Sequence, residues 1–345
     1  MKQIRRATID DVARKAGVGT TTVSRVINGG KLVAPEVRER IEKIIHQLHY
    51  RPSQAARSMA RARSHSIGLI VPRITDPFFA SIASVAQGIC RKNNHTLLIS
   101  ASLDLEEQVM AELKVFEQER VDGLIIVPPP NRTSIFRNYC KQLGHRVVSV
   151  DLPIEGCNIS SVLTNNAEAT AKATRHLIEH GRKRILFLGT DARLNTIAER
   201  KRGYSEAIAK AGLREMTVLN ANSYEYVEQA IIDASSGTRP IDGLITANSA
   251  VGIYAFQAMQ KHKISVPSKI ALITWGNFPL ADALQPSVTA ISQPITELGR
   301  LATELLFSQL QAKKPRSRSL QVPSEIILRE SCGCKGLDRS IQFET

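Results

Sequence analysis

The sequence predicts an N-terminal all-α helix-turn-helix headpiece, followed by an α/β core of two lobes, each built on a doubly wound parallel sheet. Three observations predict this fold class. Amphipathic helical segments fill the first 48 residues. From Ser66 onward, short apolar runs typical of strands alternate with helical segments in two successive rounds. A chain of 345 residues is also too long for one compact core.

The first two helical segments are short and are joined by a glycine turn. Thr8, followed three residues later by Asp11, fits a capped helix start, and Gly17 fits the end of that helix. A second helix covers residues 20–27. Gly17 and Gly19 imitate part of a dinucleotide-binding fingerprint, but its third glycine and its preceding strand are missing. We interpret the segment as a helix-turn-helix; the alternative is an ordinary helical hairpin that packs on a core.

The second helix of a helix-turn-helix enters the major groove, where its N-terminal residues meet the base edges. Here those residues are Thr20 and Thr21, with Arg25 one helical turn further on. An arginine can donate two hydrogen bonds to one guanine, whereas threonine reads bases more weakly. The charge distribution also indicates a polyanionic partner. Residues 1–66 hold 14 Lys or Arg against 5 Asp or Glu, and so carry +9 of the net charge of +14.

A third amphipathic helix is expected from Ala34 to Leu48, so that three helices share one small core. The segment from Tyr50 to Ser53 then has the composition of a new helix start, and residues 54–60 offer almost no apolar face. A helix of about two turns without such a face does not form alone, because nucleation is costly. It needs a partner in order to fold.

The stretches DVARKAGVGTTTVSRVIN, YRPSQAARSM and SIGLIVP together resemble the LacI/GalR family of bacterial repressors, and the match runs from about Thr8 to Glu330. The resemblance implies that the short helix is a hinge, which folds on operator DNA and pairs in the minor groove with its dimer mate. Met59 holds the position of the apolar wedge, where leucine is usual. Ala56 stands where the family presses a small residue into the groove. The alternative for Met59 is a linker residue without a role.

These arguments give the expected DNA contacts and domain boundaries. The residues expected to contact DNA are Thr8, Thr20, Thr21, Arg25, Asn28, Ala56 and Met59. The expected domains are a helix-turn-helix headpiece at 1–52, a hinge helix and linker at 53–65, a two-lobed effector-binding and dimerisation core at 66–330, and a flexible C-terminal tail at 331–345.

The core is expected to bind a small molecule between its lobes. Strands are expected near residues 67–71, 96–101, 123–127, 147–150, 162–165, 184–188, 243–246 and 270–274. In α/β sheets, ligands bind beyond the carboxyl ends of the strands. The resemblance implies the same, because the family core is similar to a periplasmic sugar-binding protein, with residues 287–293 and the segment before Leu320 returning across the lobes.

The residues expected to contact the effector are Phe78, Arg200, Asn248, Trp275 and Asn277. Arg200 opens a stretch that resembles the family's R-x-x-G-[FYW] segment, and its first residue usually grips the effector. An arginine is a natural clamp for hydroxyl or carboxylate oxygens, although a surface charge is the alternative. Phe78 has a core role as its alternative. Trp275 either stacks on the ligand or only covers the end of the sheet.

Three positions depart from the family pattern. Ser249, Gly276 and Asn277 stand where the resemblance places carboxylates. A carboxylate beside a bound anion would cost repulsion in a partly dehydrated site. We therefore expect an acidic or phosphorylated sugar as the carbohydrate-like effector. The alternatives are a neutral ligand held through Asn248 and water, or no effector.

Two short motifs imitate metal or enzyme sites. His176 and His180 form an H-x-x-E-H arrangement, but no third ligand is evident and Gly181 suits a helix end. Cys332 and Cys334 have no second pair nearby in the sequence. No phosphate-cradling loop, serine elbow or pair of catalytic carboxylates is evident either. We expect no catalytic residue, no metal and no cofactor.

The sequence thus predicts a cytoplasmic DNA-binding transcriptional regulator, most simply a repressor, with reduced cysteines and no membrane segment. No leucine heptad follows Arg329, so a homodimer is expected, and two-fold symmetry predicts a palindromic operator. Two alternatives remain. A transport-type sugar-binding protein would explain the lobes but not the basic helices. A sugar-metabolising enzyme would require turnover of a bound sugar.

Overall fold

The computed structural model describes residues 7–27, 30, 32–48, 50, 64–236, 238–334 and 339–341. The chain divides into two compact units, with the boundary between residues 64 and 65. The first unit is the headpiece and the second is the core. Within the described ranges, no helix is long and apolar enough to span a membrane.

The headpiece is a three-helix unit. Its helices are α1 (Ile9–Ala16), α2 (Thr20–Ile27) and α3 (Pro35–Gln47). All three contribute buried side chains to one core, namely Val12, Ala13, Ala16, Val23, Val26, Ile41 and Ile44. The helical periodicity in the sequence therefore corresponds to a real apolar interior, and the exposed faces of the helices remain available for binding.

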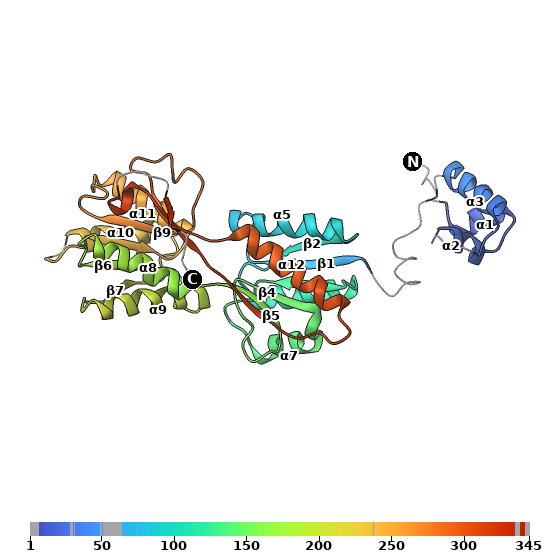
Figure 1. Cartoon of the computed structure of the whole chain (residues 1–345), viewed down its shortest axis with the longest axis horizontal. Helices are drawn as coiled ribbons and strands as arrows, with labels where there is room; N and C mark the ends of the chain where they lie inside the picture. The colour runs from blue at the N-terminus through green and yellow to red at the C-terminus, as the bar shows by residue number, and fades with distance from the viewer. Residues whose placement is uncertain are drawn as a thin grey trace. The chain divides into compact units, whose positions relative to one another are not determined.

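The first lobe of the core is a parallel sheet of six strands. Its strands, in sheet order, are β11 (Ser319–Val322), β5 (Ser160–Thr164), β4 (Val147–Val150), β3 (Gly123–Ile126), β1 (Ser66–Val71) and β2 (Thr96–Ala101). Its helices are α5 (Pro77–Lys92), α6 (Glu106–Gln118), α7 (Ser134–Leu143) and α12 (Ile295–Gln311). Figure 1 shows helices on both sides of the sheet. Strands β1, β3 and β4 are buried along their whole length, as expected for a sheet covered on both faces.

The second lobe is a mixed sheet of seven strands. Its strands, in sheet order, are β13 (Arg339–Ile341), β12 (Glu325–Leu328), β10 (Thr289–Ser292), β9 (Ala271–Trp275), β8 (Gly243–Thr246), β6 (Ile185–Leu188) and β7 (Met216–Val218). Its helices are α8 (Asn166–Glu179), α9 (Asn195–Lys210), α10 (Tyr224–Ser236) and α11 (Ser249–Lys261). Strands β12 and β13 pair antiparallel, which the expectation of purely parallel sheets did not include.

The chain passes between the lobes three times. It crosses from β5 to α8, returns from β10 to α12, and crosses again from β11 to β12. Helix α12 follows the second sheet in sequence but buries Leu298 and Leu306 in the core of the first lobe. Figure 1 shows the two orange and red segments that run between the lobes. Three connections place the carboxyl ends of several strands of both sheets near the junction.

The expected boundary of a flexible tail at residue 331 does not agree with the structure, because the chain is still packed in the second lobe there. Ser331 and Cys332 are fully buried, Ser331 Oγ donates to the Leu272 carbonyl at 2.7 Å, and the Thr289 amide donates to Ser331 Oγ at 2.8 Å. Residues 339–341 add a strand to the sheet. The segment looked like a tail because it contains no apolar run, yet small polar side chains satisfy the ends of β9 and β10.

Candidate DNA-reading face and interlobe site

Helix α2 presents a polar face at its N-terminal end. Thr20, Thr21 and Arg25 are exposed, whereas Val23 and Val26 are buried in the headpiece core. Thr21 and Arg25 are four residues apart, so both side chains lie on one side of the helix. The helix therefore offers two hydroxyls and a guanidinium on one surface, which is the donor set that can read base edges and phosphates.

Thr8 closes the start of α1. Its hydroxyl accepts from the Asp11 amide at 3.3 Å, and the Asp11 carboxylate accepts from the Thr8 amide at 2.9 Å. This reciprocal pair is a capping box, as the sequence predicted. Gly17 ends the helix in the left-handed conformation, with φ of 64°. The Thr8 hydroxyl thus has a structural task whether or not it also contacts DNA.

The other expected DNA contacts lie outside the described residues. These are Asn28, which follows α2, and Ala56 and Met59, which belong to the expected hinge at 53–65. Their roles stay predictions.

Arg200, on α9, is buried in the second lobe. Only 5% of its surface is exposed, its Nε donates to Asn166 Oδ1 at 2.8 Å, and its Nη1 donates to the Ala247 carbonyl at 2.6 Å. The guanidinium carbon lies 3.9 Å from the centroid of the Trp275 ring. Burial lowers the pKa of Arg200 to about 10 and Asp151 opposes this shift, so the side chain stays charged at neutral pH.

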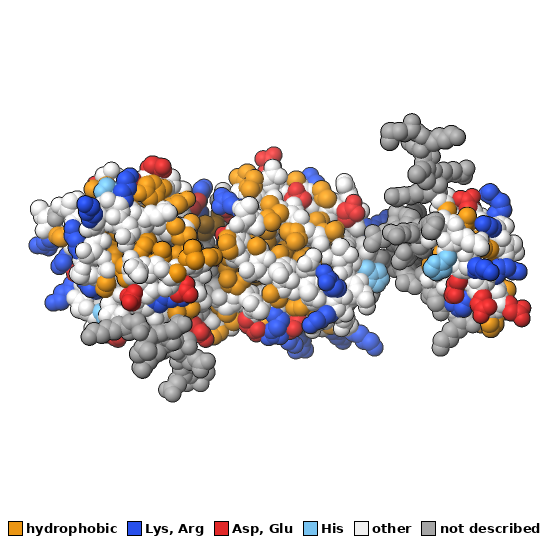
Figure 2. All heavy atoms as spheres, turned by 90° about the horizontal axis from the view of Figure 1, so that it is seen from above, with side chains coloured by type: hydrophobic (Ala, Val, Ile, Leu, Met, Phe, Trp, Pro, Cys, Tyr) orange, Lys and Arg blue, Asp and Glu red, His pale blue; other side chains and the backbone are white. Residues whose placement is uncertain are grey.

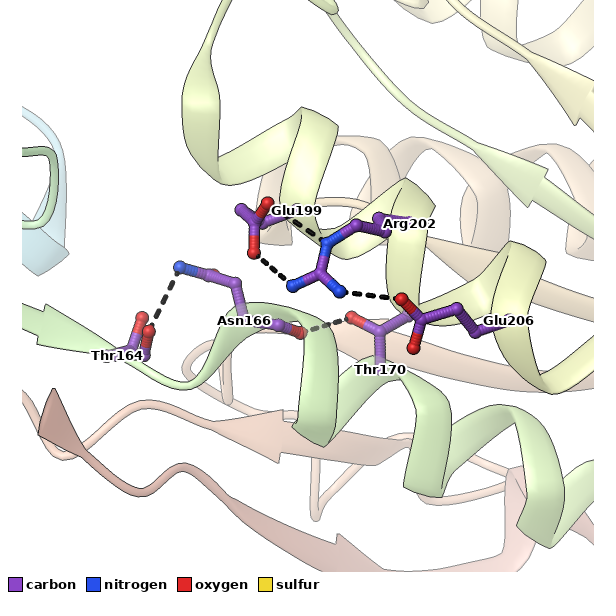
Figure 3. Close-up of polar contacts among 6 residues, drawn as sticks. All are labelled: Thr164, Asn166, Thr170, Glu199, Arg202 and Glu206. Carbon is purple, nitrogen blue, oxygen red and sulfur yellow. Dashed lines mark hydrogen bonds and ion pairs between the residues drawn. The ribbon is translucent and has the colours of Figure 1, made fainter. Parts of the chain in front are cut away.

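Arg202, two residues further along α9, points the other way. Figure 3 shows it between Glu199 and Glu206, and its guanidinium pairs with each carboxylate at 2.6 Å on the helix surface. Helix α9 packs closely on α8 at Gly203, where a Cβ would lie 1.9 Å from the Ala167 carbonyl oxygen. Arg200 lies on the side of α9 that faces α8, and Arg202 lies on the exposed side. The glycine of the R-x-x-G segment therefore brings Arg200 within reach of Asn166 at the start of α8.

Trp275 packs its ring against the guanidinium of Arg200. Its side chain is fully buried, and its Nε1 donates to Thr170 Oγ1 on α8 at 2.9 Å. The guanidinium of Arg200 lies over this ring, and a direct contact between Trp275 and an effector stays a prediction. Phe78, at the start of α5, packs half-buried against the core of the first lobe with its ring edge-on to Phe79. This position fits the alternative of a core residue.

Asn248 and Asn277 each accept a hydrogen bond from another residue of the second lobe. Asn248 Oδ1 accepts from the Val251 amide at 2.9 Å and so caps α11. Asn277 is exposed, and its Oδ1 accepts from Arg329 Nη1 at 2.9 Å. Of the five expected effector contacts, the structure brings Arg200 and Trp275 into direct contact and gives the other three separate local partners.

The replacement of acids at positions 249 and 276 has a steric explanation. Gly276 adopts φ of 85°, and a Cβ there would lie 1.9 Å from Ser249 Oγ. Ser249 Oγ in turn donates to the Trp275 carbonyl at 3.3 Å. The two substitutions therefore belong to one packed arrangement, in which the serine occupies the space that a side chain at position 276 would need. Their neutrality alone is weak evidence for an anionic ligand.

Sequence reasoning missed four aspartates that follow the strands: Asp76, Asp104, Asp151 and Asp191. Burial raises the pKa of Asp104, Arg73 lowers it, and Asp191 of the second lobe and Asp76 raise it further. Burial likewise raises the pKa of Asp151, with opposition from Arg200. Acids of both lobes are therefore close enough to raise one another's pKa. We call Asp76, Asp104, Asp151, Asp191, Arg200 and Trp275 the interlobe site.

Asp151 is the most informative of these residues. It directly follows β4, adopts φ of 68°, and receives no hydrogen bond on Oδ1 from any described residue. A half-buried aspartate with a positive φ and a buried, unpartnered carboxylate oxygen beside a buried arginine is typical of a ligand site. The rule that ligands bind at strand carboxyl ends could have found it, since the residue comes immediately after the apolar run at 147–150.

Comparison with family models agrees with this architecture. Residues 8–53 match the bacterial regulatory proteins of the lacI family, and residues 174–332 match a periplasmic binding protein-like domain. The ribose operon repressor of Haemophilus influenzae is 29% identical over 335 residues, covering 94% of this chain and 98% of the relative. The HTH-type transcriptional repressor PurR of Aliivibrio fischeri is 28% identical over 338 residues, with the same coverage of 94% and 98%.

Solved structures share the fold. The lac repressor dimer bound to operator and the anti-inducer ONPF has a TM-score of 0.83 at 20% identity, covering 95% of this chain and 99% of that chain. The CelR–cellobiose complex has a TM-score of 0.70 at 24% identity, covering 94% and 100%.

A helix-turn-helix headpiece joined to a periplasmic-binding-protein-like core defines a DNA-binding transcriptional regulator. This chain thus carries a DNA-binding domain of the lacI family and a periplasmic binding protein-like domain, and the relatives that it matches are transcriptional repressors.

Proposed function

We propose that this chain is a cytoplasmic repressor whose affinity for an operator is set by a small carbohydrate-like effector. The observation that carries the proposal is that Thr20, Thr21 and Arg25 of α2 are all exposed, with Thr21 and Arg25 on one face, in a headpiece that matches the lacI family. Arg25 reads a guanine, and the two threonines contact adjacent bases or phosphates. Thr8, Asn28, Ala56 and Met59 stay candidate contacts on the grounds given for the sequence.

Selection of binding sites from a random DNA pool tests the DNA-reading role. The expected result is a palindromic consensus with a guanine in each half-site, bound with an affinity that falls steeply as salt rises. Binding that is equal for all sequences at every salt concentration would contradict the proposal. A reporter gene placed behind the selected site then distinguishes repression from activation, because its expression falls or rises when the protein is present.

The interlobe site favours a polyhydroxylated effector. A sugar hydroxyl can donate to the unsatisfied Asp151 Oδ1 while another accepts from the Arg200 guanidinium. Asp191 is paired with Arg193, and Asp104 lies 3.9 Å from Arg73. Asp151 compensates Arg200, and Asp76 raises the pKa of Asp151 as a further acid. An anionic ligand would add negative charge beside these two acids in a partly dehydrated site. The expected acidic or phosphorylated sugar is therefore less suitable than a neutral one.

Similarity to regulators of sugar genes also supports a neutral sugar as the effector. The relatives include ribose operon repressors, and one structural neighbour is a regulator in complex with cellobiose. An effector acts here by population shift, since it can change operator affinity only by its different affinities for the binding and non-binding arrangements.

Calorimetry with matched ligands tests the effector class. Ribose, xylulose and cellobiose are compared with gluconate and glucose 6-phosphate, and a neutral sugar is expected to bind. Asp151→Asn should weaken that binding, whereas Glu206→Gln on the exposed face of α9 should not change it. If only acids and phosphates bind, the neutral-sugar assignment is wrong and the anionic expectation is restored.

We also propose a homodimer on a palindromic operator. Several large apolar side chains of the core are exposed, namely Ile74, Ile99, Leu103, Leu105 and Leu280. Figure 2 shows hydrophobic side chains spread over both lobes on the face in view. Surfaces of this kind mark protein–protein contacts, and the lac repressor neighbour is a dimer on its operator. Sedimentation at micromolar concentration should give twice the chain mass of 38.0 kDa; a monomer would contradict the proposal.

An enzymatic role is the second candidate class. The relatives are repressors, and we propose that the bound sugar leaves unchanged. Incubation of purified protein with its sugar, followed by chromatography, should return the sugar intact. A catalytic rate above that of the Asp151→Asn variant would support an enzyme instead.

A further inference from the structure

Two short motifs that are far apart in the sequence meet in the second lobe. His176 and His180 stand one turn apart at the C-terminal end of α8, and Cys332 and Cys334 follow β12. Each motif is incomplete as a metal site when it is read alone. In the fold, the segment after β12 lies against the end of α8 and brings the thiols to the imidazoles.

The distances between the donor atoms fit one metal ion. The reactive atoms of His176, Cys332 and Cys334 all lie within 4.8 Å of one another. His176 Nε2 is 3.3 Å from Cys332 Sγ and 3.6 Å from Cys334 Sγ, and His180 Nε2 is 3.7 Å from Cys334 Sγ. Sulfur and nitrogen ligands of a tetrahedral zinc ion stand about 3.6 Å apart, given Zn–S near 2.3 Å and Zn–N near 2.0 Å.

Local structure presents these donors together. Residues four apart share a helix face, and the rings of His176 and His180 have centroids 4.4 Å apart. Between the cysteines, Gly333 adopts φ of 106°, and a Cβ there would lie 3.4 Å from His180 Nδ1. A glycine therefore allows the Cys-Gly-Cys turn to fold directly beneath the histidines.

We propose that His176, His180, Cys332 and Cys334 bind one Zn²⁺ ion. Two thiolates and two imidazoles are a donor set typical of structural zinc. Three donors are already grouped, and the exposed His180 ring completes the tetrahedron by a side-chain rotation. The ion clips the end of α8 to the chain after β12. The same helix carries Asn166 and Thr170, which accept hydrogen bonds from Arg200 and Trp275. The bound ion would therefore stabilise the helix that positions these two residues.

Metal analysis of tag-free, full-length protein, purified under reducing conditions, is the direct test. The expected content is about one zinc per chain after dialysis. Replacement with Co²⁺ should give intense visible bands of a tetrahedral site and near-ultraviolet bands of thiolate ligands. No bound zinc together with no such cobalt spectrum would overturn the proposal, as would a Cys332–Cys334 disulfide that persists in reductant.

Variants identify the ligands. Cys334→Ser and His176→Gln should each weaken Co²⁺ binding more than about 100-fold, beyond the range for outer partners of a ligand. His180→Gln should also weaken binding and should shift the visible bands. Cys157→Ser is the matched control, because this half-buried thiol donates to the Arg137 carbonyl, away from the cluster, and should leave binding unchanged. Unchanged Co²⁺ binding in Cys334→Ser would overturn the assignment.

Stability of the unaltered protein gives a second readout. Removal of zinc with a chelator should lower the Tm of the core by about 5 °C or more, and added zinc should restore it. The Cys334→Ser variant should show the lower Tm with or without zinc. A Tm that does not depend on zinc in either protein would contradict a structural ion.

Discussion

The headpiece and the core place their key arginines in opposite environments. Arg25 is exposed on α2, and the described residues that are buried in the headpiece are apolar. Arg200 is 5% exposed and is held by Asn166, Ala247 and Trp275. The first residue can change without disturbing the fold, whereas the second is part of the fold. Under the roles proposed for these two arginines, DNA recognition is separable from stability in this chain, whereas effector recognition is coupled to it.

The strongest expected effect is that of Arg200→Ala. It removes a buried cation together with its contacts to Asn166, Ala247 and Trp275, so the core should lose about 3–5 kcal/mol of stability and all effector binding. Arg202→Ala is the matched control on the same helix; it loses only surface ion pairs and should cost at most about 1 kcal/mol. Urea unfolding of both variants measures the contrast, and equal losses would remove the distinction between the two arginines.

Arg25→Ala should act on DNA alone. We expect a loss of about 1–3 kcal/mol of discrimination at one base pair in each half-site, with stability changed by less than about 0.5 kcal/mol. Arg14→Ala, also exposed, should weaken all sequences alike and flatten the salt dependence. Titrations of operator variants at several salt concentrations check this. Preserved discrimination in Arg25→Ala would show that another residue reads the base.

The carboxyl group of Asp151 should make core stability depend on pH. Burial raises its folded-state pKa above the usual value of 3.8. The folded state therefore holds the proton more tightly, so this stability is full below pH 3.8 and is lost as pH rises through the folded pKa. Asp151→Asn should raise the Tm at neutral pH and make little difference at pH below that window. Asp104 shifts in the same direction but is present in both proteins.

The smallest expected effect is that of Thr8→Ala. Loss of the capping box should cost the headpiece about 1 kcal/mol, because one amide at the start of α1 loses its acceptor. Hydrogen exchange of the α1 amides in the full-length chain measures this local loss of stability. Thr8→Ser is the control that keeps the hydroxyl. An operator affinity that falls by clearly more than the ~1 kcal/mol expected from the lost cap would indicate that the hydroxyl also contacts DNA.

Local signals were sufficient for the helices of the headpiece and for the eight strands expected in the core, but not for β7, β10, β11, β12 and β13. The cap at Thr8, the turn at Gly17 and the helical spacing of apolar residues depend on neighbours within about four residues, so they are visible in the sequence. The strands of the two α/β rounds are visible for the same reason, since buried parallel strands are continuous apolar runs. The hinge residues Ala56 and Met59 stay predictions.

Contacts between distant segments decided the remaining features. Asp151 lies beside Arg200, Ser249 fills the space at Gly276, and the thiols of the segment after β12 meet the histidines of α8. Each pair joins elements that are far apart in the chain, and no periodicity or spacing encodes such a meeting. The sequence supplied the chemical groups and the secondary structure that carries them. The three-fold crossing of the chain between two sheets determined which of those groups share a site, because packing of whole elements, rather than local propensity, sets distances across the fold.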